Sequence, residues 1–227
     1  MKTAYFWLTP QGKQLAEQLQ AHFGGTVEPK ADFAEAVRRA FADCDALVFV
    51  MATGIVVRTI APLVQSKASD PAVLVLDQRG KHVISLLSGH LGGANAMAEQ
   101  AAAYLGGEAV ITTATDVEHV PAFDLFAREN HLTIENLEEL KYISGALVAG
   151  EPVSLCTAFP VEKNAFPETV QLQPFSETPR HACAVAIADT TESVTAPHVL
   201  YLRPKSLVLG VGCKKQIPPA HLEQCFR

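Results

Sequence analysis

The sequence lacks the features that mark several large classes of protein. It has no run of about 18 apolar residues that would span a membrane, and its start has no basic segment leading into a signal-like apolar stretch. It also has no dense run of lysine or arginine, and its formal net charge is −6. We therefore expect a soluble, cytoplasmic protein whose partners include neither nucleic acid nor membrane.

Patterns that hold metals, disulfides or nucleotides are also missing. The five cysteines are an odd number without a CxxC spacing, which predicts neither a disulfide framework nor a zinc site and fits a reduced compartment. No HxxxH pattern or carboxylate pair at metal-ligand spacing occurs, so we expect no protein-bound metal. The segment GHLGGAN does not match GxGxxG, and no GK[ST] follows it, so nucleotide binding has little support.

The chain does carry enough apolar residues to fold. Of its 227 residues, 48% are hydrophobic and 19% are charged, which is sufficient for a buried core in one large or two small domains. Strand-like apolar runs alternate with segments of helical periodicity, which predicts an α/β fold with an open, mostly parallel sheet and helices on both faces. The expected strands are Ala4–Leu8, Ala46–Met51, Ala72–Leu76, His82–Leu87 and Ala109–Thr112, and the expected helices begin at Pro10, Ala31, Gly54 and Leu91.

This alternation changes near Asp116, where we place the first boundary. We expect an amino-terminal α/β domain at 1–116 and a smaller α/β segment as the middle region at 117–204. The middle region has a helical pattern at Glu135–Ala149 and strand patterns at 152–158, 182–188 and 199–202. Leu207–Cys213 is typical of a new strand, so residues 205–227 are expected to begin a carboxy-terminal domain that is incomplete in this chain.

The stretch from Val83 to Asn95 is the most informative of the chain. An apolar strand leads into a loop of small residues, and apolar residues at helical spacing follow, so backbone N–H groups of the loop would face a ligand. His90 is the one side chain there that transfers protons near neutral pH, and we predict that it is a catalytic base. The alternative is that His90 only braces the loop. Gly89, Gly92 and Gly93 either expose N–H groups to substrate or are needed for a tight turn.

Three polar residues around this loop have two interpretations each. Ser88 is either a nucleophile or, more simply, the cap of the following helix. Asn95 hydrogen-bonds either the loop or the ligand. Asp116, which follows a short predicted strand, either orients His90 and a water molecule for catalysis or caps the next segment.

A second loop follows the strand at Ala46–Met51. We expect Thr53 and Gly54 to lie at the same carboxyl edge of the sheet as the His90 loop. Ligands of open α/β sheets bind at that edge. Arg58 comes one helical turn later. It would bind a substrate carboxylate or, alternatively, form a surface salt bridge.

Four motifs in one order resemble a known family. They are MATGIVVRTIAP at 51–62, DPAV at 70–73, SLLSGHLGGAN at 85–95 and TTATD at 112–116. Together they resemble the amino-terminal domain of the cobalt-precorrin-5A hydrolase family, CbiG, of anaerobic cobalamin biosynthesis. The resemblance is weaker over 117–204, and GVGCKK at 210–215 is similar to the start of the family's carboxy-terminal domain.

The resemblance implies a hydrolase that opens the ring A δ-lactone of cobalt-precorrin-5A. It would then release the extruded carbon as acetaldehyde and leave cobalt-precorrin-5B. The substrate is a cobalt corrinoid, so the cobalt arrives with it and no cofactor is expected; other enzymes of the cobalamin pathway are a further class of partner. The alternative is a non-catalytic corrinoid-binding module that needs a missing domain or a partner for the chemistry. A third reading is a flavodoxin-like sensor of anions or nucleotides.

Overall fold

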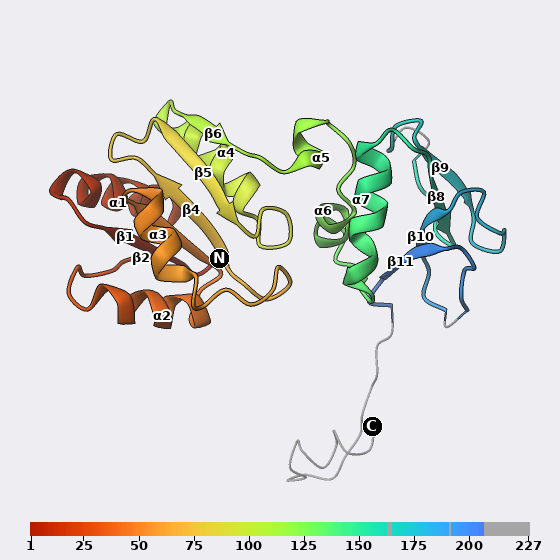
Figure 1. The fold of residues 1–227 in the computed structure, drawn as a ribbon, viewed down its shortest axis with the longest axis horizontal. Helices are drawn as coiled ribbons and strands as arrows, with labels where there is room; N and C mark the ends of the chain where they lie inside the picture. Colours follow the sequence, from red (N-terminus) through yellow and green to blue (C-terminus); the bar gives the residue numbers. More distant parts are fainter. Residues whose placement is uncertain (163–164, 191, 207–227) are drawn as a thin grey trace, which may run out of the picture.

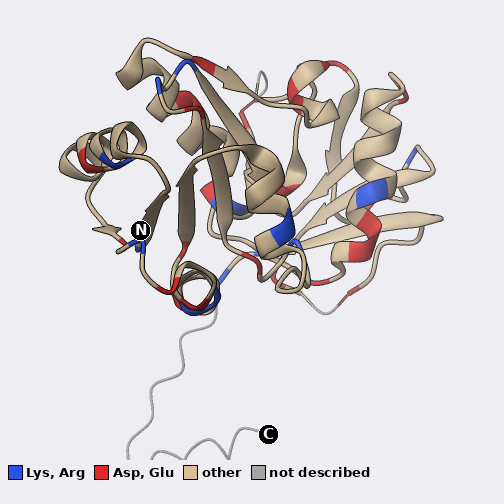
Figure 2. Ribbon diagram, turned by 60° about the vertical axis from the view of Figure 1, so that its left-hand side comes forward, with Lys and Arg blue, Asp and Glu red and all other residues tan. Residues whose placement is uncertain are grey.

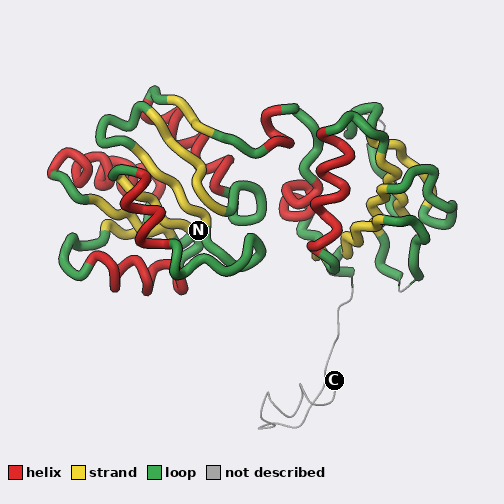
Figure 3. The backbone as a smooth tube through the Cα atoms, in the orientation of Figure 1, coloured by secondary structure: helices red, strands yellow, loops and turns green. Residues whose placement is uncertain are grey.

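Two β-sheets form two lobes that are joined by the segment around the short helix α5 (Ala114–Val117) (Figure 1). The computed structural model of the protein describes residues 1–162, 165–190 and 192–206. The strand expected at Leu207–Cys213 and residues 207–227 of the expected carboxy-terminal domain therefore lie outside the described residues. In each lobe the strands lie between helices or loops (Figure 3).

The first lobe contains a six-stranded sheet in the order β2-β1-β3-β4-β5-β6. All neighbouring strands are parallel except β4 and β5, which are antiparallel. This confirms the expected α/β class with a mostly parallel sheet. The strands are β1 (Thr3–Trp7), β2 (Thr26–Val27), β3 (Ala46–Val50), β4 (Ala72–Leu76), β5 (His82–Leu87) and β6 (Glu108–Val110).

Helices cover both faces of this sheet, as expected. Two pack against the face that carries Tyr5, Val48 and Leu74, and the other two pack against the face that carries Phe6 and Phe49. Strands β3 and β4 are buried along their whole length, which explains why both sequences are continuous apolar runs. The first pair of helices is α1 (Pro10–Phe23) and α4 (Ala94–Leu105), and the second is α2 (Phe33–Asp43) and α3 (Thr53–Ile60).

Local sequence determines where α1 begins. The Thr9 hydroxyl accepts a hydrogen bond from the Gly12 N–H at 3.0 Å, and Pro10 occupies the first helical turn, where its missing N–H costs nothing. The helix ends before Gly24, whose φ of 78° suits a glycine. The sequence predicted this start.

The reversal of the chain at β5 corrects one expectation. Residues 77–80 form a tight turn, in which the Asp77 carboxylate accepts N–H groups from Arg79 and His82, each at 2.8 Å. Strand β5 therefore runs back along β4, and the loop that follows it lies at the opposite edge of the sheet from Thr53 and Gly54. The prediction that the two loops share the carboxyl edge is wrong, because it required β5 to run parallel to β4.

The second lobe contains a five-stranded sheet in the order β7-β11-β10-β8-β9, parallel except for the pair β7 and β11. Helices α6 and α7 cover one face, and loop residues such as Phe175 and Val194 cover the other. The strands are β7 (Thr133–Ile134), β8 (Val153–Thr157), β9 (Val170–Pro174), β10 (Cys183–Ile187) and β11 (His198–Arg203), and the helices are α6 (Phe123–Glu129), the 3-10 turn η1 (Leu137–Glu139) and α7 (Leu140–Val148).

Charged residues are interspersed along the ribbon of both lobes, with acidic and basic positions next to each other (Figure 2). Among the described residues, no helix combines the length and the apolar character that crossing a bilayer requires.

We predict that the core around β3 dominates the stability of the first lobe. Phe49 is fully buried, and its ring stacks on Phe6 with a centroid distance of 4.9 Å. Phe49→Ala should lower the free energy of unfolding by about 3–5 kcal/mol, because the cavity adds to the lost burial. Val57→Ala, at an exposed position of α3, is the control and should change it little. Equal effects of both variants in urea unfolding would contradict this assignment.

Candidate active site at the junction of the lobes

The loop between β5 and α4 is shaped by its small residues. Ser88 and Gly93 have φ angles of 57° and 88°. A Cβ on Gly92 would lie 2.5 Å from the Ser88 Cβ, so only glycine fits there. The requirement for a tight turn is thus met in the structure, while binding of substrate by the loop N–H groups stays a prediction.

His90 extends from this loop to the junction and lies between two carboxylates. Its Nε2 is 2.6 Å from Asp116 Oδ2, and its Nδ1 is 3.1 Å from Asp124 Oδ1. The side chains of His90 and Asp124 are 10% and 11% exposed, whereas that of Asp116 is 34% exposed. The structure therefore brings together the two predicted catalytic residues, His90 and Asp116, and adds Asp124 from the second lobe.

This arrangement favours the protonated imidazolium form of His90. Ionised carboxylates only accept hydrogen bonds, so both ring nitrogens of His90 must donate. The hydrogen bond to Asp124 raises the pKa of His90 above 6.5, against the opposing effect of burial, and Asp116 raises it further. Asp116 lies closer to His90, but Asp124 has the larger effect on the His90 pKa because the Asp124 carboxylate is more shielded from water. Burial alone would raise the pKa of Asp124, but the bond and charge of His90 hold it below its usual value.

Asn95 holds the carboxylate of Asp116 in position by hydrogen bonding. The Asn95 Nδ2 donates to Asp116 Oδ2 at 3.0 Å and to Thr113 Oγ1 at 2.9 Å, and Ser85 Oγ donates to Asn95 Oδ1 at 2.6 Å. Thr113 Oγ1 also donates to Asp116. Asn95 is itself buried, so its contacts are to the loop and its neighbours. The Asp116 carboxylate is bonded to His90, Asn95 and Thr113. It does not cap the following helix α6, whose N-cap is Ala122 with no side-chain cap bond.

Ser88 does not have the role of helix cap. Its hydroxyl donates to the Asp70 carbonyl at 2.9 Å, and α4 begins at Ala94 after the N-cap Gly93 with no side-chain cap. The expectation of a serine cap is wrong because the loop continues for five residues before the helix starts. The Ser88 hydroxyl is bonded to a carbonyl oxygen and not to His90, so nothing in this geometry activates it as a nucleophile.

Two site residues were missed by the sequence analysis. Arg128 Nη1 donates to the His90 carbonyl at 2.6 Å, and both Arg128 and Asp124 belong to α6 of the second lobe. The one available signal was Asp124 itself, an acidic residue within the apolar pattern of Phe123, Phe126 and Ala127. Nothing in the sequence paired it with a histidine 34 positions away.

A cleft at the junction borders this cluster. It has a volume of about 320 Å³ and is lined by His90 and Asp124 together with residues of the linker and of α7. In the described part of the chain, no group of three or more His, Cys, Asp or Glu side chains is arranged to hold a metal ion.

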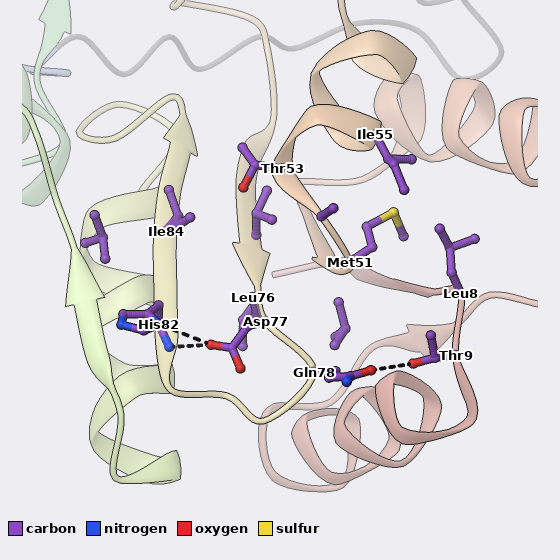
Figure 4. A pocket seen from close by; sticks show the side chains of 14 residues that line it. Leu8, Thr9, Met51, Thr53, Ile55, Leu76, Asp77, Gln78, His82 and Ile84 are labelled. Atoms are coloured by element: carbon purple, nitrogen blue, oxygen red, sulfur yellow. Dashed lines mark hydrogen bonds and ion pairs between the residues drawn. The ribbon is translucent and has the colours of Figure 1, made fainter.

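A larger cavity, of about 630 Å³, lies at the other edge of the first sheet. It opens where β1, β3 and β4 end, and its wall is mostly apolar, with Leu8, Met51, Ile55 and Ile84 around one space (Figure 4). On its rim, Thr9 Oγ1 donates to Gln78 Oε1 at 3.2 Å and His82 Nδ1 lies 3.4 Å from Asp77 Oδ2.

Of the second predicted loop, Thr53 lines this cavity, while Gly54 and Arg58 are not among its lining residues. Arg58 is exposed beside Gly54, and it forms no salt bridge within the described residues. These three residues therefore do not border the His90 cleft, and their role in substrate binding stays a prediction.

Comparison with protein families agrees with this two-lobe arrangement. A family model described as "Cobalamin synthesis G N-terminal" matches residues 35–116, and one described as "Cobalamin biosynthesis central region" matches residues 121–204. The chain belongs to the CbiG family. The family resemblance of the four sequence motifs is thereby confirmed.

Curated relatives of the CbiG family support the same assignment. The chain is 37% identical over 235 residues to the cobalt-precorrin-5A hydrolase of Salmonella typhimurium, covering 95% of this chain and 66% of that protein. It is 35% identical over 191 residues to the cobalt-precorrin-5A hydrolase of Priestia megaterium, covering 78% of this chain and 50% of that protein. The chain thus spans between half and two thirds of the length of these relatives.

A crystal structure described as a cobalamin biosynthesis protein G homologue from Sulfolobus solfataricus has a similar fold. The TM-score is 0.54 at 24% sequence identity, over 99% of this chain and 67% of that chain. This likeness supports the fold with its two successive sheets.

The His90–Asp124 pair makes a testable prediction about pH. Because folding raises the pKa of His90, its stabilising effect is complete below about 6.5 and is lost as pH rises through the raised pKa. Asp124→Asn should lower the pKa of His90 in an NMR titration of the imidazole signals and weaken this pH dependence of stability. Asp116→Asn should lower it less. A pKa of His90 that is unchanged in Asp124→Asn would show that the pair does not form in solution.

Proposed function

We propose that this chain is the part of a cobalt-precorrin-5A hydrolase that performs the lactone opening and the release of acetaldehyde. The observation that carries the proposal is the buried His90, held between two carboxylates at the junction of the lobes. The names of the two curated relatives support the substrate. The reaction needs proton transfers at two successive steps, and this cluster holds a proton that can be given and taken back.

In the first step, the lactone ring opens by addition of water. Substrate binding displaces Asp116, the more exposed of the two carboxylates, from His90 Nε2. Asp116 takes a proton from the attacking water, whose oxygen bonds to the lactone carbonyl carbon. The bond from that carbon to the ring oxygen breaks, and His90 donates its Nε2 proton to this leaving oxygen. Backbone N–H groups of residues 89–93 are the candidates for stabilising the oxyanion.

In the second step, the carbon–carbon bond breaks. The first step leaves His90 neutral and the former ring oxygen as a hydroxyl group. His90 now takes the proton of this hydroxyl group and returns to the imidazolium form. The carbon–oxygen double bond of acetaldehyde forms, and the electron pair of the broken bond moves to the cobalt-bearing macrocycle. Asp124 stays bonded to Nδ1 throughout and holds the ring in position, which makes it a positioning residue. No cofactor beyond the substrate's own cobalt enters these steps, and the cytoplasmic location and pathway partners expected from the sequence stay predictions.

This mechanism predicts the effect of removing His90. His90→Ala should reduce acetaldehyde release from cobalt-precorrin-5A, generated in situ, by about 10²–10⁴-fold, because one group serves as acid and then as base. The wild-type rate should fall as pH rises through the raised pKa of His90, since the first step needs its proton. In Asp124→Asn this fall should move to lower pH. The matched control is His22→Ala, at an exposed position of α1.

The outcomes separate catalysis from binding. Loss of release in His90→Ala with intact fold supports the proposed role. Release at the wild-type rate in this variant would exclude His90 as acid or base. No release by the wild-type chain, with the corrinoid still bound, would leave the second candidate function.

That second candidate is a non-catalytic corrinoid-binding module. Two observations favour it. Both ring nitrogens of His90 are occupied by carboxylates, one from the linker helix α5 and one from α6 of the second lobe. The larger of the two cavities described above is mostly apolar and lies at the other edge of the sheet. The cavity lies outside the carboxyl ends of β1 and β3, the point at which the strand order reverses. In this function His90 holds the junction together and the macrocycle lies against the apolar wall.

A substitution that fills the apolar cavity tests whether the corrinoid binds there. Ile84 faces the cavity (Figure 4), so Ile84→Trp should abolish corrinoid binding if the macrocycle lies there. If the substrate binds at the junction, this variant should bind corrinoid and release acetaldehyde as the wild type does. Thermal unfolding of the variant serves as the control for its fold.

A further inference from the structure

The cleft at the junction has walls from both lobes. Lys67, from the loop between α3 and β4, lies on the first-lobe side, and Lys141 of α7 lies on the second-lobe side. His90 and Asp124 line the same cleft. The linker and α7 complete the lining with Thr113, Ala114, Thr115, Leu140, Ser144, Gly145 and Val148.

The two lysines make this cleft positive. Neither forms a salt bridge within the described residues, and Lys141 Nζ lies 4.7 Å from the centroid of the Tyr142 ring. The carboxylates of Asp116 and Asp124 together with the His90 imidazolium carry a net charge of −1. The two lysine ammonium groups add two positive charges, so the sum is +1. Exposed ammonium groups of this kind keep three donors each for an anion.

The wall of the cleft on α7 has open space at Gly145. Gly145 lies inside this helix, where glycine weakens helical structure, and a Cβ built on it would meet no other atom within 4 Å. Packing of the protein against itself therefore does not require glycine at this position. A side chain there would instead reduce the space of the cleft.

We propose that this cleft is a carboxylate-binding subsite for the corrinoid substrate, in which Lys67 and Lys141 each bind a peripheral carboxylate from opposite lobes. The inference rests on the proposed function for the identity of the substrate. A macrocycle with acetate and propionate side chains carries several such groups, and the subsite binds them beside His90. Overall attraction by the protein is unfavourable at a net charge of −6, so local lysines are needed.

The test uses two stable corrinoids as probes. Cobyrinic acid carries free peripheral carboxylates, whereas cobinamide carries amides in their place. Lys67→Ala and Lys141→Ala should each weaken binding of cobyrinic acid by about tenfold, as expected for loss of one charge-assisted hydrogen bond, and should leave cobinamide binding unchanged. Lys81→Ala removes the same charge at an exposed position of the β4–β5 turn and should change neither.

A second variant blocks the space without changing charge. Gly145→Leu introduces a residue with good helix propensity, so the helix should stay intact, and its side chain should weaken binding of both probes. The subsite proposal is overturned if the wild type does not bind cobyrinic acid, or binds it no more tightly than cobinamide. It is also overturned if the lysine variants bind cobyrinic acid as tightly as the wild type does. If the lysine effects appear but acetaldehyde is not released, the subsite stands and the catalytic proposal fails. If acetaldehyde is released at the wild-type rate and KM in both lysine variants, the subsite fails and the catalytic proposal stands.

Discussion

The direction of strand β5 is the constraint on which the arrangement of both candidate sites depends. The tight turn at residues 77–80 reverses the chain, so β5 begins where β4 ends. The five residues of β4 span roughly 17 Å, which separates the His90 loop from the loop at Thr53 by about the height of the sheet. The reversal takes the glycine-rich loop away from the carboxyl edge and places it against the second lobe. His90 can therefore contact Asp124, which belongs to helix α6 of the second lobe.

The charge balance of the His90 cluster links the fold to the proposed chemistry. Two carboxylates near one imidazole are unfavourable unless the ring is protonated, since each carboxylate then has a donor. Protonation of His90 therefore favours the contact between the lobes, and in the proposed mechanism the same proton goes to the lactone oxygen. Arg128 adds a second connection through the His90 carbonyl, and it needs no change of protonation state. The ring can thus lose its proton during a turnover while the loop stays attached to α6.

Much of the fold was predictable from the sequence because it follows from local patterns. The strands at Ala72–Leu76 and His82–Leu87 have the predicted bounds, and α1 begins at the predicted residue. Strand β9 was missed although its sequence, VQLQP, alternates apolar and polar residues as a half-buried strand does. The strand is short and ends in a proline, within a proline-containing stretch that favours a loop. The antiparallel pairing of β4 and β5 was in fact available: parallel neighbours need a crossover of a dozen or more residues, and only five separate these strands.

The site was less predictable because its contacts join distant segments. His90 and Asp116 stood out by their positions after predicted strands, but Asp124 and the two cleft lysines become partners only when the lobes meet. A ligand that binds Lys67 and Lys141 together would bridge the two lobes and so stabilise their contact. The same ligand adds negative charge beside His90 and so favours its protonated form. Substrate binding and retention of the His90 proton would then reinforce each other. The protonated His90 is the form that the first step of the proposed mechanism requires.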